Sequence, residues 1–170
     1  MTINIRKLDL PEGFCGSVYL HSMPGRRETI EEFFTAADEQ DIDCIACLTS
    51  IEEIREKSPS YSAALESGLM RQTILAFPIE DFGIPDNLER FFEYISQLAN
   101  LLRKKNKLLI HCGAGIGRTG LCAICLLCVL GLPEDQATLF VRNRGSGPET
   151  EAQVAFVNEF VSRIGKLGNR

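Results

Sequence analysis

The sequence predicts an α/β fold in which helices flank a central, mostly parallel sheet. Short apolar runs typical of strands alternate with longer amphipathic runs typical of helices along the whole chain. The length of 170 residues suits one domain with one sizeable core, so we expect residues 1–170 to form a single unit. Apolar residues make up 45% of the chain and charged residues 24%, as in an ordinary globular protein.

The first half of the chain predicts three strands and two helices. The strands are expected at Ser17–Leu20, Asp43–Leu48 and Gln72–Phe77. Thr29-Ile-Glu-Glu32 and Ser50-Ile-Glu-Glu53 both have the spacing of a capping box, which predicts a helix after each serine or threonine. The apolar face of the first helix consists of Ile30, Phe33, Phe34 and Ala37.

The second half begins with the clearest helix, which follows Pro85 and has Asp86 as a suitable N-cap. Its apolar face consists of Leu88, Phe91, Phe92, Ile95, Leu98, Ala99 and Leu102. The positive charges in the last turn of this helix interact favourably with the helix dipole. We therefore interpret them as the solvated end of the helix rather than as a nucleic-acid-binding patch. The remaining elements are a buried strand at Lys107–His111, an apolar helix at Thr119–Leu130, a helix with Pro133 in its first turn, and a last helix from about Pro148.

Charge and hydropathy limit the partners that we expect. The net charge of −5 does not favour nucleic acid or an anionic membrane, because both need a basic face. The beginning of the sequence lacks the apolar core of a signal peptide. The longest uncharged apolar stretch, Gly120–Leu132, has 13 residues and is too short to span a bilayer. We therefore predict a cytoplasmic monomer with no nucleic-acid or membrane partner.

The seven cysteines are expected to be free thiols, because their number is odd and no signal peptide is evident. Cys44 and Cys47 have the C-x-x-C spacing, which raises the alternatives of a metal site and a redox site. They lie in a predicted strand, where positions three apart face opposite sides, so a buried structural role is favoured. Cysteines in the apolar helix step round its axis and are interpreted as core residues. We expect no metal and no cofactor.

A glycine-rich loop between the strand at Lys107–His111 and the next helix carries the predicted chemistry. Backbone N–H groups and the helix dipole favour an anion at such a place. Glycines at alternate positions let the backbone curl and turn its amides inward. The predicted phosphate-binding residues are Gly113, Ala114, Gly115, Ile116, Gly117 and Arg118.

Cys112 and Arg118 stand at the two ends of this loop. The planar guanidinium of Arg118 can hold two phosphate oxygens at once. An electropositive ring of amides favours the thiolate form of Cys112, and a thiolate beneath a bound phosphate is placed for in-line attack on phosphorus. We therefore predict that Cys112 is a nucleophile.

A nucleotide site is the rival interpretation of the three glycines. In the dinucleotide-binding turn the third glycine comes one residue later, and Arg118 occupies that position here. The loop also lies about two thirds along the chain, which leaves too little length for the usual βαβ unit. The sequence has no G-K-[ST], which excludes a nucleotide P-loop.

The stretch His111-Cys112-x5-Arg118-Thr119-Gly120 resembles the signature of the protein tyrosine phosphatase superfamily at every fixed position. The resemblance implies a phosphatase-like fold and a phosphocysteine intermediate. It also implies that His111 tunes the cysteine through hydrogen bonds and that the Thr119 hydroxyl stabilises the thiolate as it leaves.

A second stretch, Asp81-Phe-Gly-Ile-Pro85, resembles the mobile acid loop of this superfamily, although no tryptophan precedes it. A phosphate monoester needs a general acid that protonates the leaving group, and the resemblance assigns this role to Asp81. Glu80 and Asp86 are the competing carboxylates, and Asp86 is assigned to the helix N-cap instead. The longer pattern from Pro78 to Asp86 is similar to that of small dual-specificity members.

A third, weaker resemblance concerns Gln153, which lies where the superfamily presents a glutamine to the hydrolytic water. The alternative is an ordinary polar residue in the first turn of the last helix. His21 has no comparable context and is interpreted as an ordinary polar residue.

These features together predict an enzyme that hydrolyses phosphate monoesters on a phosphoprotein or phosphopeptide, with phosphotyrosine and also phosphoserine or phosphothreonine as candidate groups. A phosphoinositide phosphatase, an RNA 5′-phosphatase and a non-catalytic phosphate-binding pseudophosphatase are the alternatives. The loop lacks the lysine that often marks phosphoinositide phosphatases. The arginines that would help a more anionic substrate, if they flank the pocket, are Arg26, Arg27, Arg142 and Arg144.

Overall fold

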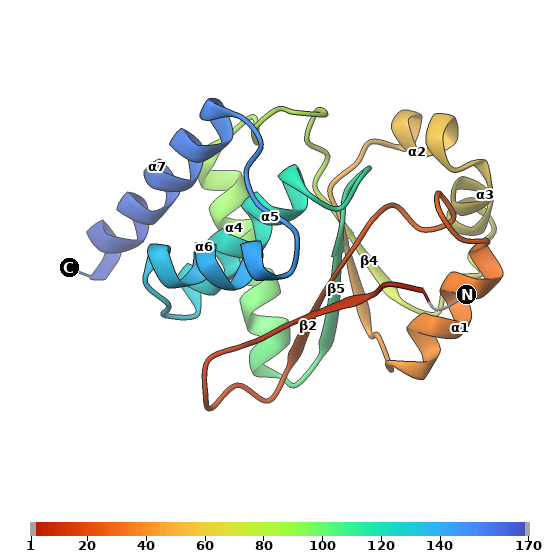
Figure 1. Cartoon of the computed structure of the whole chain (residues 1–170), viewed down its shortest axis with the longest axis horizontal. Coiled ribbons are helices and arrows are strands. Elements are labelled where there is room, and N and C mark those ends of the chain that lie inside the picture. The colour runs from red at the N-terminus through yellow and green to blue at the C-terminus, as the bar shows by residue number, and fades with distance from the viewer. Residues whose placement is uncertain (1–2, 169–170) are drawn as a thin grey trace.

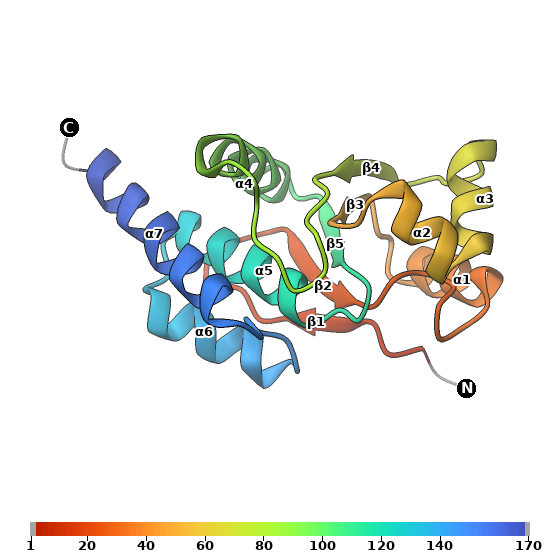
Figure 2. The ribbon, with the colours of Figure 1, turned by 90° about the horizontal axis from the view of Figure 1, so that it is seen from above.

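The centre of the molecule, shown in Figure 1, is a five-stranded sheet with the strand order β1-β2-β5-β3-β4, and Figure 2 labels all five strands. The computed structural model describes residues 3–168. The strands are β1 (Arg6–Leu8), β2 (Ser17–His21), β3 (Cys44–Cys47), β4 (Thr73–Ala76) and β5 (Lys107–His111). Only the edge strand β1 is antiparallel to its neighbour, and all other pairs are parallel. The predicted fold class is therefore confirmed.

Two layers of helices cover the sheet, as the two orthogonal views in Figures 1 and 2 show. One face carries α1 (Ile30–Glu39), α2 (Ile51–Lys57) and α3 (Pro59–Ser67). The other face carries α4 (Leu88–Arg103), α5 (Gly117–Val129), α6 (Glu134–Asn143) and α7 (Glu151–Gly168). The larger half of the hydrophobic core lies under α4–α7, and the smaller half lies under α1–α3.

Helix α5 is the central element of its layer and packs against α4, α6 and α7. Its residues from Gly117 to Cys128 are all buried, which explains why its sequence is apolar on every side. None of the helices within residues 3–168 is both long enough and apolar enough to cross a membrane.

The four predicted strands are present to within one or two residues at each end, but two elements were not predicted. Strand β1 has only three residues and owes its existence to antiparallel pairing with β2 rather than to any pattern of its own. Helix α3 has only a weak apolar stripe, so its periodicity does not reveal it. It begins with a proline at its first position and ends at Gly68, which has the left-handed φ of 68°.

The predicted N-cap of α4 was wrong. Asn87, not Asp86, caps this helix, because its side-chain oxygen accepts a hydrogen bond from the Arg90 amide at 2.9 Å. Asp86 lies one residue further out and instead forms an exposed ion pair with the Arg90 side chain at 3.3 Å. Pro133 likewise stands one position before α6 rather than in its first turn.

The cysteine predictions agree with the structure at two points. Cys44 and Cys47 point into different halves of the core, as the strand spacing predicts. All seven cysteines are free thiols, and only Cys15 is exposed.

Candidate active site

The loop that links β5 to α5 lies at the carboxyl edge of the parallel strands, in the middle of the sheet. Ligands of α/β folds bind at this edge. The loop runs tightly against the end of β2, where Gly115 has a φ of +75°. A Cβ atom at Gly115 would lie 2.5 Å from the carbonyl oxygen of His21, so only glycine fits there.

The side chain of Cys112 lies at the base of this loop and is almost fully buried. Its sulfur accepts a hydrogen bond from the amide of Gly115 at 3.3 Å. The hydroxyl of Thr119 is buried in the first turn of α5 and has no hydrogen-bond partner within the described residues. Its predicted role toward the leaving thiolate stays a prediction, and the free hydroxyl is compatible with it.

Arg118 is the centre of the polar contacts of the site, with only 2% of its side chain exposed. Its two terminal nitrogens form a bidentate ion pair with Glu53, at 2.7 and 2.9 Å. Nη1 also donates to the carbonyl oxygen of Ile79 at 2.8 Å, and Nη2 donates to Asp81 at 3.0 Å. The Nε–H has no partner in the part of the chain that the structure describes, so one edge of the guanidinium is available to an anion.

Glu53 is a site residue that the sequence analysis missed. Ser50 caps α2 by accepting a hydrogen bond from the Glu53 amide at 3.1 Å, but the Glu53 side chain does not return to the Ser50 amide. It points to Arg118 and Lys57 instead, whereas Glu32 in α1 completes its capping box with Thr29. The carboxylate that the box pattern assigned to helix capping therefore serves the site.

The two cationic partners of Glu53 stabilise its ionised carboxylate. Burial would raise the pKa of this carboxyl, but the hydrogen bonds and positive charges of Arg118 and Lys57 outweigh burial and lower the pKa to about 2. Lys57 also reaches Asp81 at 3.3 Å, so it links α2 to the loop that precedes α4. Glu53 and Lys57 thus fix the arginine and the acid loop relative to each other.

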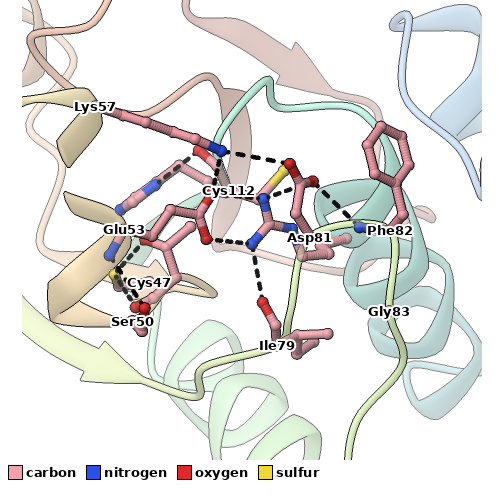
Figure 3. Close-up of polar contacts among 12 residues, drawn as sticks. Cys47, Ser50, Glu53, Lys57, Ile79, Asp81, Phe82, Gly83 and Cys112 are labelled. Carbon is pink, nitrogen blue, oxygen red and sulfur yellow. Dashed lines mark hydrogen bonds and ion pairs between the residues drawn. The ribbon is translucent and has the colours of Figure 1, made fainter.

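Asp81 belongs to the cluster of polar contacts drawn in Figure 3 and reaches Arg118 at 3.0 Å. Its side chain is 49% exposed, and one carboxylate oxygen also accepts a hydrogen bond from the Phe82 amide at 3.1 Å. Phe82 has a positive φ of 58°, which turns the backbone sharply at this point. Of the three candidate acids, Asp81 alone contacts Arg118 within residues 3–168, since Glu80 and Asp86 are exposed and form no such contact.

His111 connects the loop to α3. Its Nδ1 lies 3.3 Å from the carbonyl oxygen of Cys112, and its Nε2 lies 3.1 Å from the hydroxyl of Tyr61. Burial raises the pKa of Tyr61 well above its ordinary value, so this hydroxyl stays protonated. The donor and acceptor roles in the two contacts of His111 depend on the tautomer of its ring. The hydrogen bond of His111 thus goes to the Cys112 backbone rather than to the sulfur.

Gln153 is fully buried in the first turn of α7. Its Oε1 accepts a hydrogen bond from the Glu149 amide at 2.8 Å, and its Nε2 donates to the carbonyl oxygen of Gly83 at 3.0 Å. The residue therefore joins the last helix to the acid loop, a role that neither sequence interpretation included.

We expect Glu53→Gln to destabilise the protein by about 1–3 kcal/mol at neutral pH, because the amide cannot replace the paired carboxylate of a charge-assisted contact. The pKa of Glu53 is lower in the folded state, so its stabilising contribution is complete above the ordinary pKa of 4.5. It is lost as the pH falls from 4.5 toward about 2. Thermal unfolding of the wild type and the variant across this range measures the difference, which should shrink with acidity.

Glu52→Gln is the matched control for this experiment. Glu52 carries the same charge in the same first turn of α2, but it is exposed. The Glu52→Gln variant loses the same favourable interaction of a carboxylate with the helix dipole as Glu53→Gln. It should therefore change the free energy of unfolding by less than about 1 kcal/mol. Equal effects of both variants would contradict a specific role of Glu53 at Arg118.

A buried cysteine and an arginine lie in one glycine-rich loop, with a carboxylate in contact with the arginine, which is the set of groups that a cysteine-based phosphatase requires. The chain belongs to the family described as "Polymorphic toxin system, DSP-PTPase phosphatase" (Tc-R-P), whose model matches residues 20–132, and so to the cysteine-based protein tyrosine phosphatase superfamily. The match spans more than half of the chain and includes both the acid loop and the Cys112 loop.

Curated relatives agree with this family over part of their length. The chain is 35% identical over 91 residues to 197R of Invertebrate iridescent virus 6, a tyrosine phosphatase by name, covering 52% of this chain and 34% of that protein. It is 38% identical over 91 residues to cyclin-dependent kinase inhibitor 3 of Rattus norvegicus, covering 51% of this chain and 42% of that protein. The chain thus matches less than half the length of these relatives.

Solved structures agree over nearly the whole chain. Kinase associated phosphatase superposes with a TM-score of 0.83 at 22% identity, covering 97% of each chain, which shows the shared fold. The active form of Tk-PTP superposes with a TM-score of 0.70 at 27% identity, covering 87% of this chain and 93% of that one.

Proposed function

We propose that this protein hydrolyses phosphate monoesters on phosphoproteins through a phosphocysteine intermediate. One observation carries the proposal: the Cys112 sulfur, the Arg118 guanidinium and the Asp81 carboxylate gather at a single loop, with Arg118 in contact with Asp81. A nucleophile, an anion-binding group and a proton donor are the three parts that this reaction needs.

Substrate binding changes the partners of Arg118. Glu53 occupies the end of the guanidinium, which leaves Nε and Nη2 as the edge for two phosphate oxygens. Nη2 now contacts Asp81, so an arriving phosphate dianion displaces the carboxylate from the arginine. Asp81 is then released from Arg118 and faces the substrate, where we propose that it acts as the general acid.

The reaction has two steps. The Cys112 thiolate attacks phosphorus, the bond from phosphorus to the leaving oxygen breaks, and Asp81 gives its proton to that oxygen. Water then attacks the phosphocysteine, gives a proton to Asp81, and the phosphorus–sulfur bond breaks to release phosphate and the thiolate. The free Thr119 hydroxyl is available to stabilise this thiolate. Gln153 holds the acid loop through Gly83, which supports a positioning role for this residue.

Phosphotyrosine, phosphoserine and phosphothreonine are the substrates that we propose, for a protein of the cytoplasm that acts as a monomer without a cofactor. The names of the relatives support a protein substrate, since they refer to tyrosine phosphatases and a kinase inhibitor. The exposed Phe82 ring beside Asp81 offers an apolar contact at the mouth of the site, and the positions within the loop carry no cation for a highly phosphorylated headgroup.

A turnover panel tests the proposal. The purified protein is assayed for phosphate release from phosphotyrosine and phosphothreonine peptides, a phosphoinositide and an RNA 5′-phosphate. We expect the largest kcat/KM for a peptide substrate and measurable release from phosphotyrosine. Faster release from the lipid or the RNA would contradict the protein substrate, and no release from any of them would contradict catalysis and favour a pseudophosphatase.

A further inference from the structure

The segment between α6 and α7 follows the Cys112 loop residue by residue. The Ser146 hydroxyl donates to the carbonyl oxygen of Gly115 at 2.6 Å, and the Gly147 amide donates to the carbonyl oxygen of Ile116 at 3.1 Å. A Cβ atom at Gly120 would overlap the backbone of Gly147, so the segment packs tightly against the first turn of α5. The residues after Gly147 are therefore brought to the end of the loop.

Glu149 is the residue whose side chain reaches the end of the loop. A Cβ atom at Gly117 would overlap Oε2 of Glu149 and would lie 3.1 Å from its Cδ. The carboxylate thus occupies the place that a side chain at position 117 would take, and Arg118 is the next residue of the loop. Because Glu149 is exposed, water can reach this carboxylate.

Structural roles do not account for the Glu149 carboxylate. Within residues 3–168 the carboxylate has no hydrogen bond and no ion pair, whereas the backbone amide of Glu149 donates to Oε1 of Gln153 at 2.8 Å. The Thr150 hydroxyl, rather than Glu149, accepts a hydrogen bond from the Gln153 amide in the first turn of α7, at 3.1 Å. A negative charge beside an anion-binding loop also opposes phosphate binding, so this carboxylate does not serve to hold the substrate phosphate.

Gln153 connects Glu149 to the acid loop. Its buried side chain accepts from the Glu149 amide and donates from Nε2 to the carbonyl oxygen of Gly83 at 3.0 Å. Gly83 belongs to the same loop as Asp81. One amide side chain therefore links the two segments that carry the carboxylates of Asp81 and Glu149.

We propose that the Glu149 carboxylate binds and orients the water that hydrolyses the phosphocysteine. The inference rests on the proposed function, because the phosphocysteine must form first. When the leaving group has departed, the water takes its place beside Asp81, which protonated the leaving oxygen. Asp81 contacts Arg118, and Glu149 contacts the adjacent Gly117, so a water at this place can donate one hydrogen bond to each carboxylate.

The proposed step uses the two hydrogens of the water differently. The water oxygen forms a bond to phosphorus as the phosphorus–sulfur bond breaks, and the electron pair of that bond stays on the Cys112 sulfur. One proton passes to Asp81. The other stays on the oxygen that becomes part of the released phosphate, and its hydrogen bond to Glu149 fixes the direction of attack.

A carboxylate suits this task because it only accepts hydrogen bonds. Both hydrogens of the water then turn toward Asp81 and Glu149, which leaves a lone pair of the water oxygen free to face phosphorus. The first step of the reaction involves no water, so it does not use Glu149. The proposal therefore predicts that loss of Glu149 slows the breakdown of the phosphocysteine and leaves its formation unchanged.

The test follows the hydrolysis of p-nitrophenyl phosphate by the wild type and Glu149→Ala in a stopped-flow experiment. The initial burst of nitrophenolate measures formation of the phosphocysteine, and the slower steady release measures its breakdown. We expect the burst rate to change by less than about twofold and the steady-state kcat to fall by about tenfold to a hundredfold, as loss of one hydrogen bond to a charged group allows. Mass spectrometry of acid-quenched samples should detect phosphocysteine accumulated at Cys112 in the variant.

Two further variants make the result specific to the carboxylate at position 149. Glu149→Gln keeps an acceptor oxygen and should retain more of the steady-state kcat than Glu149→Ala. Glu151→Ala is the matched control, because Glu151 is an exposed glutamate at the first position of α7. This control should leave both the burst rate and kcat unchanged.

Two results would overturn the inference. One is an equal kcat for the wild type and Glu149→Ala without accumulated phosphocysteine, which would leave the proposed hydrolysis intact. The other is a burst that slows as much as kcat, because a distorted loop slows both steps. Absence of both burst and steady turnover in the wild type would instead count against the proposed function itself.

Discussion

Cys112→Ser is expected to abolish turnover while leaving phosphate binding in place. A serine hydroxyl is a much weaker nucleophile than a cysteine thiol, and the hydrogen bond from the Gly115 amide does not replace the base that a serine would need. We expect kcat for an aryl phosphate to fall by about four orders of magnitude or more. Inorganic phosphate should still bind, because the loop amides and Arg118 remain, and isothermal titration calorimetry measures this.

Cys15→Ser is the control for this substitution. Cys15 is exposed and lies far along the chain from the loop, so its loss should change neither kcat nor phosphate binding. Turnover retained by Cys112→Ser would contradict the phosphocysteine mechanism. If Cys112→Ser loses both turnover and phosphate binding, thermal unfolding shows whether the variant is still folded. We expect its unfolding temperature to match that of the wild type.

The sequence predicted those parts of the fold that have a local signal. The apolar face of α4 and the short buried run of β5 can be read directly from their periodicity, and the loop between β5 and α5 carries its own chemistry. Strand β1 could not be predicted, since three residues show no period and their partner strand is needed to form them. The error at Asp86 arises because Asp86 and Asn87 are adjacent and both residue types are good caps, so the residue types alone do not choose between them.

The sequence motifs pointed to residues that the structure brings together, but they did not reveal Glu53, which contacts the arginine among them. Cys112, Arg118 and Asp81 lie in two short stretches that resemble a known signature, and the structure brings them together. Glu53 was assigned to helix capping, because a capping box and an ion pair with a distant arginine use the same residue type at the same position. The two roles of this residue type can be told apart only by the contact between Glu53 and Arg118, which lie 65 residues apart in the sequence. No local sequence pattern contains this contact.

Arg6 shows the same limit of local sequence patterns. Its position in β1 suggests an ordinary polar residue at a sheet edge, and its contacts lie 109 and 140 residues away in the sequence. The sequence shows that the intervening residues of the Cys112 loop include no cation. It could not show that arginines from three segments of the chain line a cavity beside this loop. Net charge alone, at −5, conceals this local concentration of positive charge.

Asp81→Ala is expected to lower kcat by about two to four orders of magnitude, because general acid catalysis contributes that much. The size of the loss should depend on the leaving group. A nitrophenolate leaves without a proton, so its phosphate ester should be affected least, whereas the alkoxide of phosphothreonine needs the proton and should be affected most.

The neighbouring carboxylates provide the controls for Asp81. Asp86→Ala removes an exposed ion pair with Arg90 and should leave kcat unchanged, as should Glu80→Ala. Asp81→Ala also removes one partner of Arg118, so a purely structural role would weaken phosphate binding equally for every leaving group. A loss of kcat that grows with the basicity of the leaving group cannot arise in that way, because only a proton donor senses the charge that develops on the leaving oxygen.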